Sequence, residues 1–306
     1  MRGVRELAER KLCRPPAWLP EAIQYETQMG SVAYGVSSDT SDVDLYGFCI
    51  PPRQVVFPHL AGHIPGFGLT PPERFEQYQQ HHIRDPSELG GHGRSYDVAI
   101  FSIVKYFQLC LENNPNMVDS LFTPHTCVLT STAVGQKVRE NRRLFLHRGC
   151  WVKFKGYAYS QLHKMAIKTP EPGSKRDALV QEHGYDVKFA YHTVRLLLEV
   201  EQLLLEGDLD LQRHREQLKA IRRGEWTEPQ IREWAAAKEA DLERAYANSV
   251  LPAAPNETAL RNLLLDCLEL HYGDLKGAVA APGAAEAALR QIEEISRRAL
   301  AALDDS

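Results

Sequence analysis

Two aspartates stand two residues apart in an otherwise apolar run, "DVDLYGFCI" at residues 42–50. The run predicts a β-strand, in which side chains two residues apart project from the same face and their Cα atoms lie about 6.5–7 Å apart. Asp42 and Asp44 therefore share one face, and Val43 and Leu45 pack on the other. Two neighbouring carboxylates repel each other unless cations lie between them. The pair predicts a site for hard divalent cations, Mg²⁺ (or Mn²⁺), unless one aspartate only caps a turn and the other is solvated.

A small-residue pair, Gly30-Ser31, precedes this strand, with ten residues between Ser31 and Asp42. We expect the following "SVAYG" to form one short helix, so that the backbone N–H groups and the dipole of its first turn face a phosphate group. Glycine permits close backbone approach, and the serine hydroxyl adds a donor. Taken alone, the pair could be an ordinary turn. Together with the two carboxylates, it predicts a site for a nucleoside triphosphate (NTP) and two metal ions about 3.5–4 Å apart.

The rest of the chain predicts an α+β protein. Strand patterns occur in "AIQYETQ" at 22–28 and in "SYDVAIFSI" at 95–103, whereas residues 58–94 have no clean period and form either a functional loop or short elements that the pattern does not reveal. From residue 136 onward the periods are helical. We therefore expect a catalytic domain with a mixed sheet and helices over residues 1–135 and an all-α domain over 136–306. The predicted helices of the second domain cover residues 185–206, 211–223, 227–248, 257–272 and 284–303.

Charge is distributed unevenly along the chain, whose net charge is −4. Residues 142–195 contain eleven Lys and Arg against four Asp and Glu, which favours an anionic partner for this segment. Within it, residues 145–160 ("FLHRGCWVKFKGYAYS") interleave cations with aromatic rings, a composition typical of a groove for single-stranded nucleic acid. The alternatives are a solvated helical surface for the charges and a packed core for the rings.

One polar stripe is expected on the helix over 185–206, because Lys188, His192, Arg195 and Glu199 follow each other at helical spacing. Lysine supplies a point charge and arginine a bidentate fork, and both suit a triphosphate. The alternative is an exposed ion pair between Arg195 and Glu199 at i and i+4.

Several other classes of protein are disfavoured. No apolar run approaches eighteen residues, so we expect no membrane span, and the first thirteen residues resemble a short amphipathic helix more than a signal peptide. The six cysteines are scattered, which fits reduced thiols in a cytoplasmic protein. "GGHGR" at 90–94 lacks the P-loop pattern, and the histidines, including His81-His82, have no metal-ligand spacing.

The spacing of Gly30-Ser31 and Asp42-Val43-Asp44 resembles the signature of the DNA polymerase beta-like nucleotidyltransferase superfamily. The segments "GSVAYGVSSDTSDVDLYGFCIPP", "LENNPNMVDSLF" and "YDVKFAYHTVRLLLEVEQLLLEGDLDL" look like the RNA-repair-pathway DNA polymerase beta family (RlaP) over residues 25–225. That superfamily takes a third carboxylate from a later strand, and Asp97 in "SYDVAIF" matches it.

This resemblance implies transfer of NMP from an NTP to an acceptor hydroxyl with release of pyrophosphate. Asp42, Asp44 and Asp97 would hold two Mg²⁺ ions, and Asp97 would help to deprotonate the acceptor. Gly30 and Ser31 would cradle phosphates, and Lys188, His192 and Arg195 would contact the triphosphate.

The association with RNA repair implies that the acceptor is an RNA 3′-OH. The alternatives are a protein hydroxyl (AMPylation), a small-molecule hydroxyl, metal-dependent phosphate hydrolysis, and a non-catalytic RNA-binding module on the same fold.

Overall fold

The computed structural model of the protein describes residues 2–37, 41–57 and 74–273. The strands are β1 (Ile23–Met29), β2 (Val43–Cys49), β3 (Gln77–Asp85), β4 (Arg94–Ser102) and β5 (Val128–Ser131). The first six helices are α1 (Val4–Glu9), α2 (Leu19–Ala22), α3 (Arg53–Val56), α4 (Ile103–Leu111), α5 (Pro115–Phe122) and α6 (Ala133–Glu140). The others are α7 (Cys150–Ile167), α8 (Lys175–His183), α9 (Val187–Glu206), α10 (Arg215–Arg222), α11 (Glu228–Ala247) and α12 (Glu257–Tyr272).

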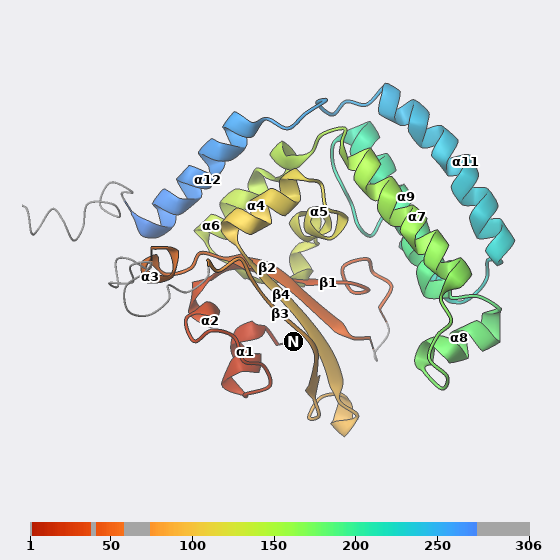
Figure 1. Ribbon diagram of the computed structural model, residues 1–306, viewed down its shortest axis with the longest axis horizontal. Helices are drawn as coiled ribbons and strands as arrows, with labels where there is room; N and C mark the ends of the chain where they lie inside the picture. The colour runs from red at the N-terminus through yellow and green to blue at the C-terminus, as the bar shows by residue number, and fades with distance from the viewer. Residues whose placement is uncertain (1, 38–40, 58–73, 274–306) are drawn as a thin grey trace, which may run out of the picture. The chain divides into compact units, whose positions relative to one another are not determined.

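The strands form one mixed sheet in the order β3-β4-β2-β1-β5 (Figure 1). β2 and β4 run parallel, and the other neighbouring pairs are antiparallel. From residue 136 onward, the described secondary structure is helical. The mixed sheet followed by helices confirms the predicted α+β class.

One face of the sheet carries Asp44 and the side chains in register with it. Met29 of β1 and Asp97 of β4 are its direct neighbours, so all three project to the same side. Farther along this face, α4 packs on the sheet through the rings of Tyr106 and Phe48, whose centroids lie 4.9 Å apart. The opposite face is covered by α1, and the Val4 N–H at the start of this helix donates to Glu26 Oε1 of β1 at 2.8 Å. Asp44 and Asp97 lie near the N-terminal ends of β2 and β4, and they line one cavity together with residues of α8, α9 and α10.

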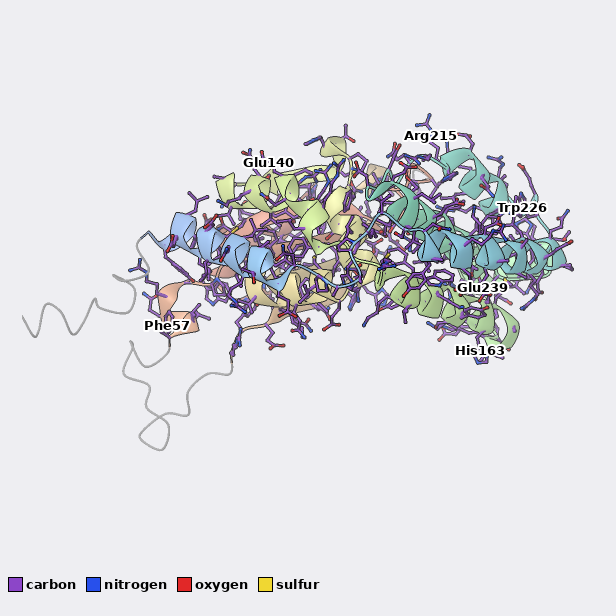
Figure 2. The ribbon with its side chains drawn as sticks, turned by 90° about the horizontal axis from the view of Figure 1, so that it is seen from above. Phe57, Glu140, His163, Arg215, Trp226 and Glu239 are labelled. Atoms are coloured by element: carbon purple, nitrogen blue, oxygen red, sulfur yellow. The ribbon has the colours of Figure 1, made fainter. Side chains whose placement is uncertain are left out.

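The helical layer is built around α9. Fifteen residues of this helix are buried, because α7, α10 and α11 all pack against it. Glu239 of α11 (labelled in Figure 2) contacts the middle of α7, where the ammonium of Lys155 lies 2.6 Å from one of its carboxylate oxygens. α9 ends at Gly207, which has φ of 63° and closes the helix as the sequence predicts.

The chain divides into two compact units. One contains residues 1–50 and 76–264, and therefore holds the sheet together with α7, α9 and α11. The other contains residues 51–75 and 265–306; within it, the guanidinium of Arg53 lies 5.6 Å from the ring centroid of Tyr272. The boundary between residues 135 and 136 stays a prediction.

Three predicted elements correspond closely to β1, β2 and β4, and the predicted helices over 185–206, 211–223, 227–248 and 257–272 correspond to α9, α10, α11 and α12. The helix predicted over 284–303 lies outside the described residues. Two strands were not predicted, β3 within the aperiodic stretch and β5. All six cysteines are free and buried, and no described helix is long and apolar enough to cross a membrane.

Candidate active site

Asp44 and Asp97 come from the two parallel strands in the middle of the sheet and stand directly opposite each other. Asp42 lies just before β2, two residues from Asp44, and therefore belongs to the same face. The three predicted carboxylates are thus gathered at one end of the β2–β4 pair. Asp42 is exposed and the other two are partly buried.

Burial, and after it the negative charges of Asp97 and Asp42, raise the pKa of the Asp44 carboxyl to about 6, even though the positive charge of Lys188 acts to lower it. The phenol of Tyr46, on the same face, has a pKa raised to about 12 by burial and by the same two carboxylates, Asp44 and Asp97. Negative charge is therefore concentrated where water is partly excluded, a position that a cation would stabilise.

The segment after β1 is a turn over residues 30–35, and the predicted short helix is absent. The Tyr34 N–H donates to the Gly30 carbonyl at 3.3 Å, but the next N–H, of Gly35, bonds to Val32 in a tighter turn at 3.0 Å. Gly30 and Gly35 both have positive φ, 68° and 67°, so the chain reverses before a second helical turn can form.

Gly30 lies against Asp44. A Cβ at position 30 would be 2.0 Å from Asp44 Oδ2, a distance that no side chain can occupy. Within the described chain, the N–H groups of Ser31 and Val32, which follow Gly30, donate to no backbone carbonyl. Successive free N–H groups form a concave donor site that suits an anion, so the phosphate-binding prediction for Gly30 and Ser31 needs no helix.

A cavity of about 560 Å³ brings this turn and the carboxylates together with α8, α9 and α10. Gly30, Ser31, Asp42, Asp44 and Asp97 line it. Its cationic side chains are Arg176 of α8, Lys188 of α9 and Arg222 of α10. Of these, only Lys188 was predicted.

The three cations are held differently. Arg176 Nε lies 3.6 Å from Asp186 Oδ2 and its guanidinium stacks 4.4 Å from the Phe189 centroid. Arg222 donates to the Val36 carbonyl at 2.7 Å. Lys188 is exposed, and its ammonium pairs with no carboxylate of the described chain. It is therefore available to an anionic ligand.

His192 also lines the cavity, as predicted. Burial and the positive charges of Arg195, Lys188, Arg176 and Arg222 hold its pKa well below its ordinary value. The imidazole is therefore neutral near pH 7 and can offer one donor or acceptor, but no charge.

Arg195 requires a correction. Its side chain is buried, and its Nη1 donates to Asp119 Oδ2 at 2.5 Å and to both oxygens of Glu199 at 2.9 Å. Arg195 is not among the residues that line the cavity. The polar residues follow each other on one side of α9 as predicted, but Asp119 of α5 packs against Arg195. The arrangement therefore does not support the predicted contact of Arg195 with a triphosphate. The alternative predicted an exposed ion pair between Arg195 and Glu199: the pair forms, but it is buried.

The buried ion pair of Arg195 and Asp119 also contacts the turn over residues 30–35. Tyr34, whose backbone belongs to the turn, donates from its hydroxyl to Asp119 Oδ2 at 2.7 Å, and the Arg195 guanidinium lies 4.3 Å from its ring centroid. Burial, together with the negative charge of Asp119, raises the pKa of Glu199 well above its ordinary value, whereas Arg195 acts to lower it. Asp119 is a residue that sequence reasoning missed, although it lies in the segment "LENNPNMVDSLF".

His81 and His82 are further residues whose place was missed. They lie at a bulge of β3, where the register shifts between Gln80 and Ile83, and His82 has φ of 56°. The His82 N–H donates to Asp97 Oδ1 at 2.7 Å, and His81 Nδ1 lies 3.7 Å from Asp97 Oδ2. A bulge of this kind redirects side chains beside a site.

The donor set fits the predicted divalent cation in its chemistry. Mg²⁺ prefers carboxylate oxygens, and Asp44 is a buried carboxyl that two neighbouring acids disfavour in its charged form. In the described chain, no group of three acidic, histidine or cysteine side chains is arranged so that it could hold a metal ion, and Asp97 contacts the β3 bulge through both of its oxygens. Metal binding by these residues therefore stays a prediction.

The aromatic, basic segment of α7 is only partly exposed: Tyr157 and Tyr159 reach the surface, and two other rings do not. Trp151 and Phe154 are buried, so they cannot stack on nucleotide bases. Lys155 is paired with Glu239 and Glu243 of α11. The reason is that α7 presents this side to α9 and α11, and the packed-core alternative is correct for both rings.

Comparison with known proteins agrees with the resemblance seen in the sequence. The model of the RNA repair pathway DNA polymerase beta family matches residues 4–266. A nucleotidyltransferase-like protein from Exiguobacterium sibiricum 255-15 aligns with 87% of this chain and 72% of its own, at 11% identity and a TM-score of 0.27. No curated protein matches the sequence.

Proposed function

The chain belongs to the RNA repair pathway DNA polymerase beta family, and from this premise we propose that it is a Mg²⁺-dependent nucleotidyltransferase. It would move an NMP from an NTP to an acceptor hydroxyl, most suitably the 3′-OH of an RNA, and release pyrophosphate. The observation that carries the proposal is one cavity that combines the Asp44–Asp97 pair, the Gly30–Ser31 turn and three cationic side chains.

In this reaction a bond forms between the acceptor oxygen and the α-phosphorus, and the bond from that phosphorus to the pyrophosphate oxygen breaks. The leaving pyrophosphate takes the electron pair and gains negative charge. Lys188, Arg176 and Arg222 lie where they can neutralise that charge, and the N–H groups after Gly30 can bind phosphate oxygens. Arg176 and Arg222 thus join Lys188 in the role first predicted for Arg195.

Asp42, Asp44 and Asp97 would hold the divalent ion or ions, which when bound supply charge neutralisation and activation of the acceptor hydroxyl. The proton of that hydroxyl needs a nearby base. Asp97 is suited to receive it because its carboxylate is only partly buried and lines the cavity, and the hydrogen bond from the β3 bulge holds it in place.

The test incubates the protein with Mg²⁺, each labelled NTP in turn, and either a 3′-OH RNA or the same RNA with a 3′-phosphate. A labelled 3′-OH strand lengthened by one or more nucleotides is expected, with the 3′-phosphate strand unchanged. Label on the protein would favour a protein acceptor, and free NMP without transfer would favour hydrolysis. Asp42→Ala should abolish transfer and keep the wild-type circular dichroism spectrum; retained turnover would contradict the metal role.

A further inference from the structure

A second cavity, of about 420 Å³, lies at the other side of the carboxylates. Asp42 lines both cavities, so the two meet at this residue. The second cavity is built from β3, the start of β4 and the connection between them, and its lining includes His82, Arg84, His92 and Arg94. None of these four was assigned a role above in binding the NTP.

The charged side chains of the lining are mainly cationic. Two guanidinium groups stand against the single carboxylate of Asp42, and two imidazoles add polar ring nitrogens. Arg94 is already paired, with its Nε 3.3 Å from Glu88 Oε2. Arg84 is exposed and has no ion pair with a described carboxylate, so its charge is available to an anion.

Arg84 also lies on the correct face. Its partner on the neighbouring strand β4 is Ser95. Ser95 projects to the same side of the sheet as Asp97, which lies two residues later. Asp42 precedes Val43, whose partner is Tyr96, and thus stands opposite Ser95. Arg84 and Asp42 are therefore two strand spacings apart, about 10 Å between their Cα atoms.

Local backbone geometry leaves room for the guanidinium. A Cβ at Gly93, which has φ of 80°, would be 3.2 Å from Arg84 Nε. On the other side of Arg84, the positive φ of His82 keeps the bulge N–H on Asp97. The same strand thus contacts the carboxylate pair through His82 and offers a free cation through Arg84.

We propose that this second cavity binds the acceptor, and that the acceptor is an RNA 3′ end whose last phosphodiester contacts Arg84 while its terminal hydroxyl points to Asp42 and Asp97. This inference rests on the proposed function. A protein hydroxyl brings no phosphate for Arg84, whereas an RNA end brings one next to its reacting hydroxyl. The strand enters from the β3 edge and the NTP from the α8–α9 side, so that they meet at Asp42.

The test variant is Arg84→Gln, and the matched control is Arg5→Gln, which removes an exposed arginine from α1 on the opposite face of the sheet. Steady-state transfer is measured with a single-stranded 3′-OH RNA, and NTP binding is measured separately by equilibrium titration. A lost contact between an arginine and a phosphate should raise the KM for RNA about tenfold or more in Arg84→Gln. Its NTP affinity should equal that of the wild type, and Arg5→Gln should leave both quantities unchanged.

Salt dependence gives a second readout. The slope of log KM for RNA against log salt should be smaller by about 0.7 in Arg84→Gln, the value for one phosphate contact on a single strand. Binding of a dye-labelled 3′-phosphate RNA to the NTP-free protein, followed by anisotropy, should weaken by the same factor as KM rises. Circular dichroism of the variant should match the wild type because Arg84 makes no ion pair in the described chain.

The outcomes separate the two proposals. Wild-type transfer to RNA with an unchanged KM and salt slope in Arg84→Gln would overturn the acceptor cavity and leave the proposed function standing. Transfer of label to protein, without competition from excess RNA, would also overturn it. If the wild type transfers nothing to any acceptor, but Arg84→Gln still weakens RNA binding selectively, the proposed function fails and the RNA cavity is supported.

Discussion

Replacing Gly30 by alanine should separate the chemistry of the site from the stability of the fold. The new Cβ would lie 2.0 Å from Asp44 Oδ2, where real Cβ contacts do not fall under 3.0 Å. The Asp44 carboxylate must therefore rotate or the turn must shift by about 1 Å. Displacement of a reacting or metal-binding group by that distance lowers catalysis about a hundredfold, so nucleotidyl transfer by Gly30→Ala should fall by that factor or more.

The free energy of unfolding of Gly30→Ala should fall by only a few kcal/mol. Alanine at φ of 68° costs about 1–2 kcal/mol, and forcing a methyl group into a filled position costs about 1–3 kcal/mol more. Gly173→Ala is the matched control, because Gly173 has φ of 75° but nothing within 4 Å of its added Cβ. It carries the backbone cost without the collision. We expect urea unfolding to show a loss of about 1–2 kcal/mol for Gly173→Ala and full transfer activity.

The two variants are compared by urea unfolding followed by circular dichroism, and by initial transfer rates at a temperature where both are folded. Two results would refute the reasoning. Gly30→Ala with a transfer rate within twofold of the wild type would mean that the contact with Asp44 does not position a catalytic group. Equal losses of activity in both variants would attribute the effect to backbone strain alone.

Three further predictions concern a buried acid on the opposite face of the sheet, two cationic residues of α9 and a buried ring of α7. Burial raises the pKa of Glu26 from 4.5 to about 7, so its stabilising effect is complete below pH 4.5 and is lost as pH rises through about 7. In urea titrations from pH 4.5 to 8, wild type should lose about 3 kcal/mol more than Glu26→Gln, whereas the exposed Glu21→Gln should follow the wild type. Lys188→Met should raise the KM for NTP about tenfold and keep an unfolding free energy within about 0.5 kcal/mol of the wild type. Arg195→Met should lose about 3–5 kcal/mol of unfolding free energy, because it leaves two buried carboxyls unpaired. Equal stability of the two variants would contradict the buried role of Arg195. Trp151→Ala should lower the free energy of unfolding, measured in urea or by heating, by about 3–5 kcal/mol, because Trp151 is a core ring and not part of a base-stacking surface.

The strands that carry the carboxylates could be predicted from the sequence because they are central and half-buried. β2 and β4 show apolar residues on alternating or continuous positions, and the aspartates stand out against them. β3 could not be predicted in the same way. It lies at the edge of the sheet, and in "QYQQHHIRD" only Ile83 and Asp85 are buried, so no hydrophobic period marks it.

The site cations illustrate a different limit. Helical spacing correctly places Lys188, His192 and Arg195 on one side of α9, but spacing does not tell which part of that side a neighbouring helix covers. Asp119 of α5 packs against α9 at Arg195, so Arg195 is buried while Lys188 stays exposed. Arg176 and Arg222 come from helices whose approach to α9 depends on the tertiary packing alone.

The buried pairing of Arg195 has a consequence for the site because it connects two elements that line the cavity, the turn over residues 30–35 and α9. Tyr34 belongs to this turn, Asp119 to α5 and Arg195 to α9, and the three side chains meet through hydrogen bonds of 2.7 and 2.5 Å at one oxygen, Asp119 Oδ2. A guanidinium among two buried carboxyls is a costly arrangement unless its geometry is kept, since breaking such a pair costs several kcal/mol. A shift of the turn relative to α9 would break it. The cost that makes this cluster a weak source of stability therefore makes it an effective restraint, which holds Gly30 and Ser31 at a fixed distance from Lys188 two turns before Arg195.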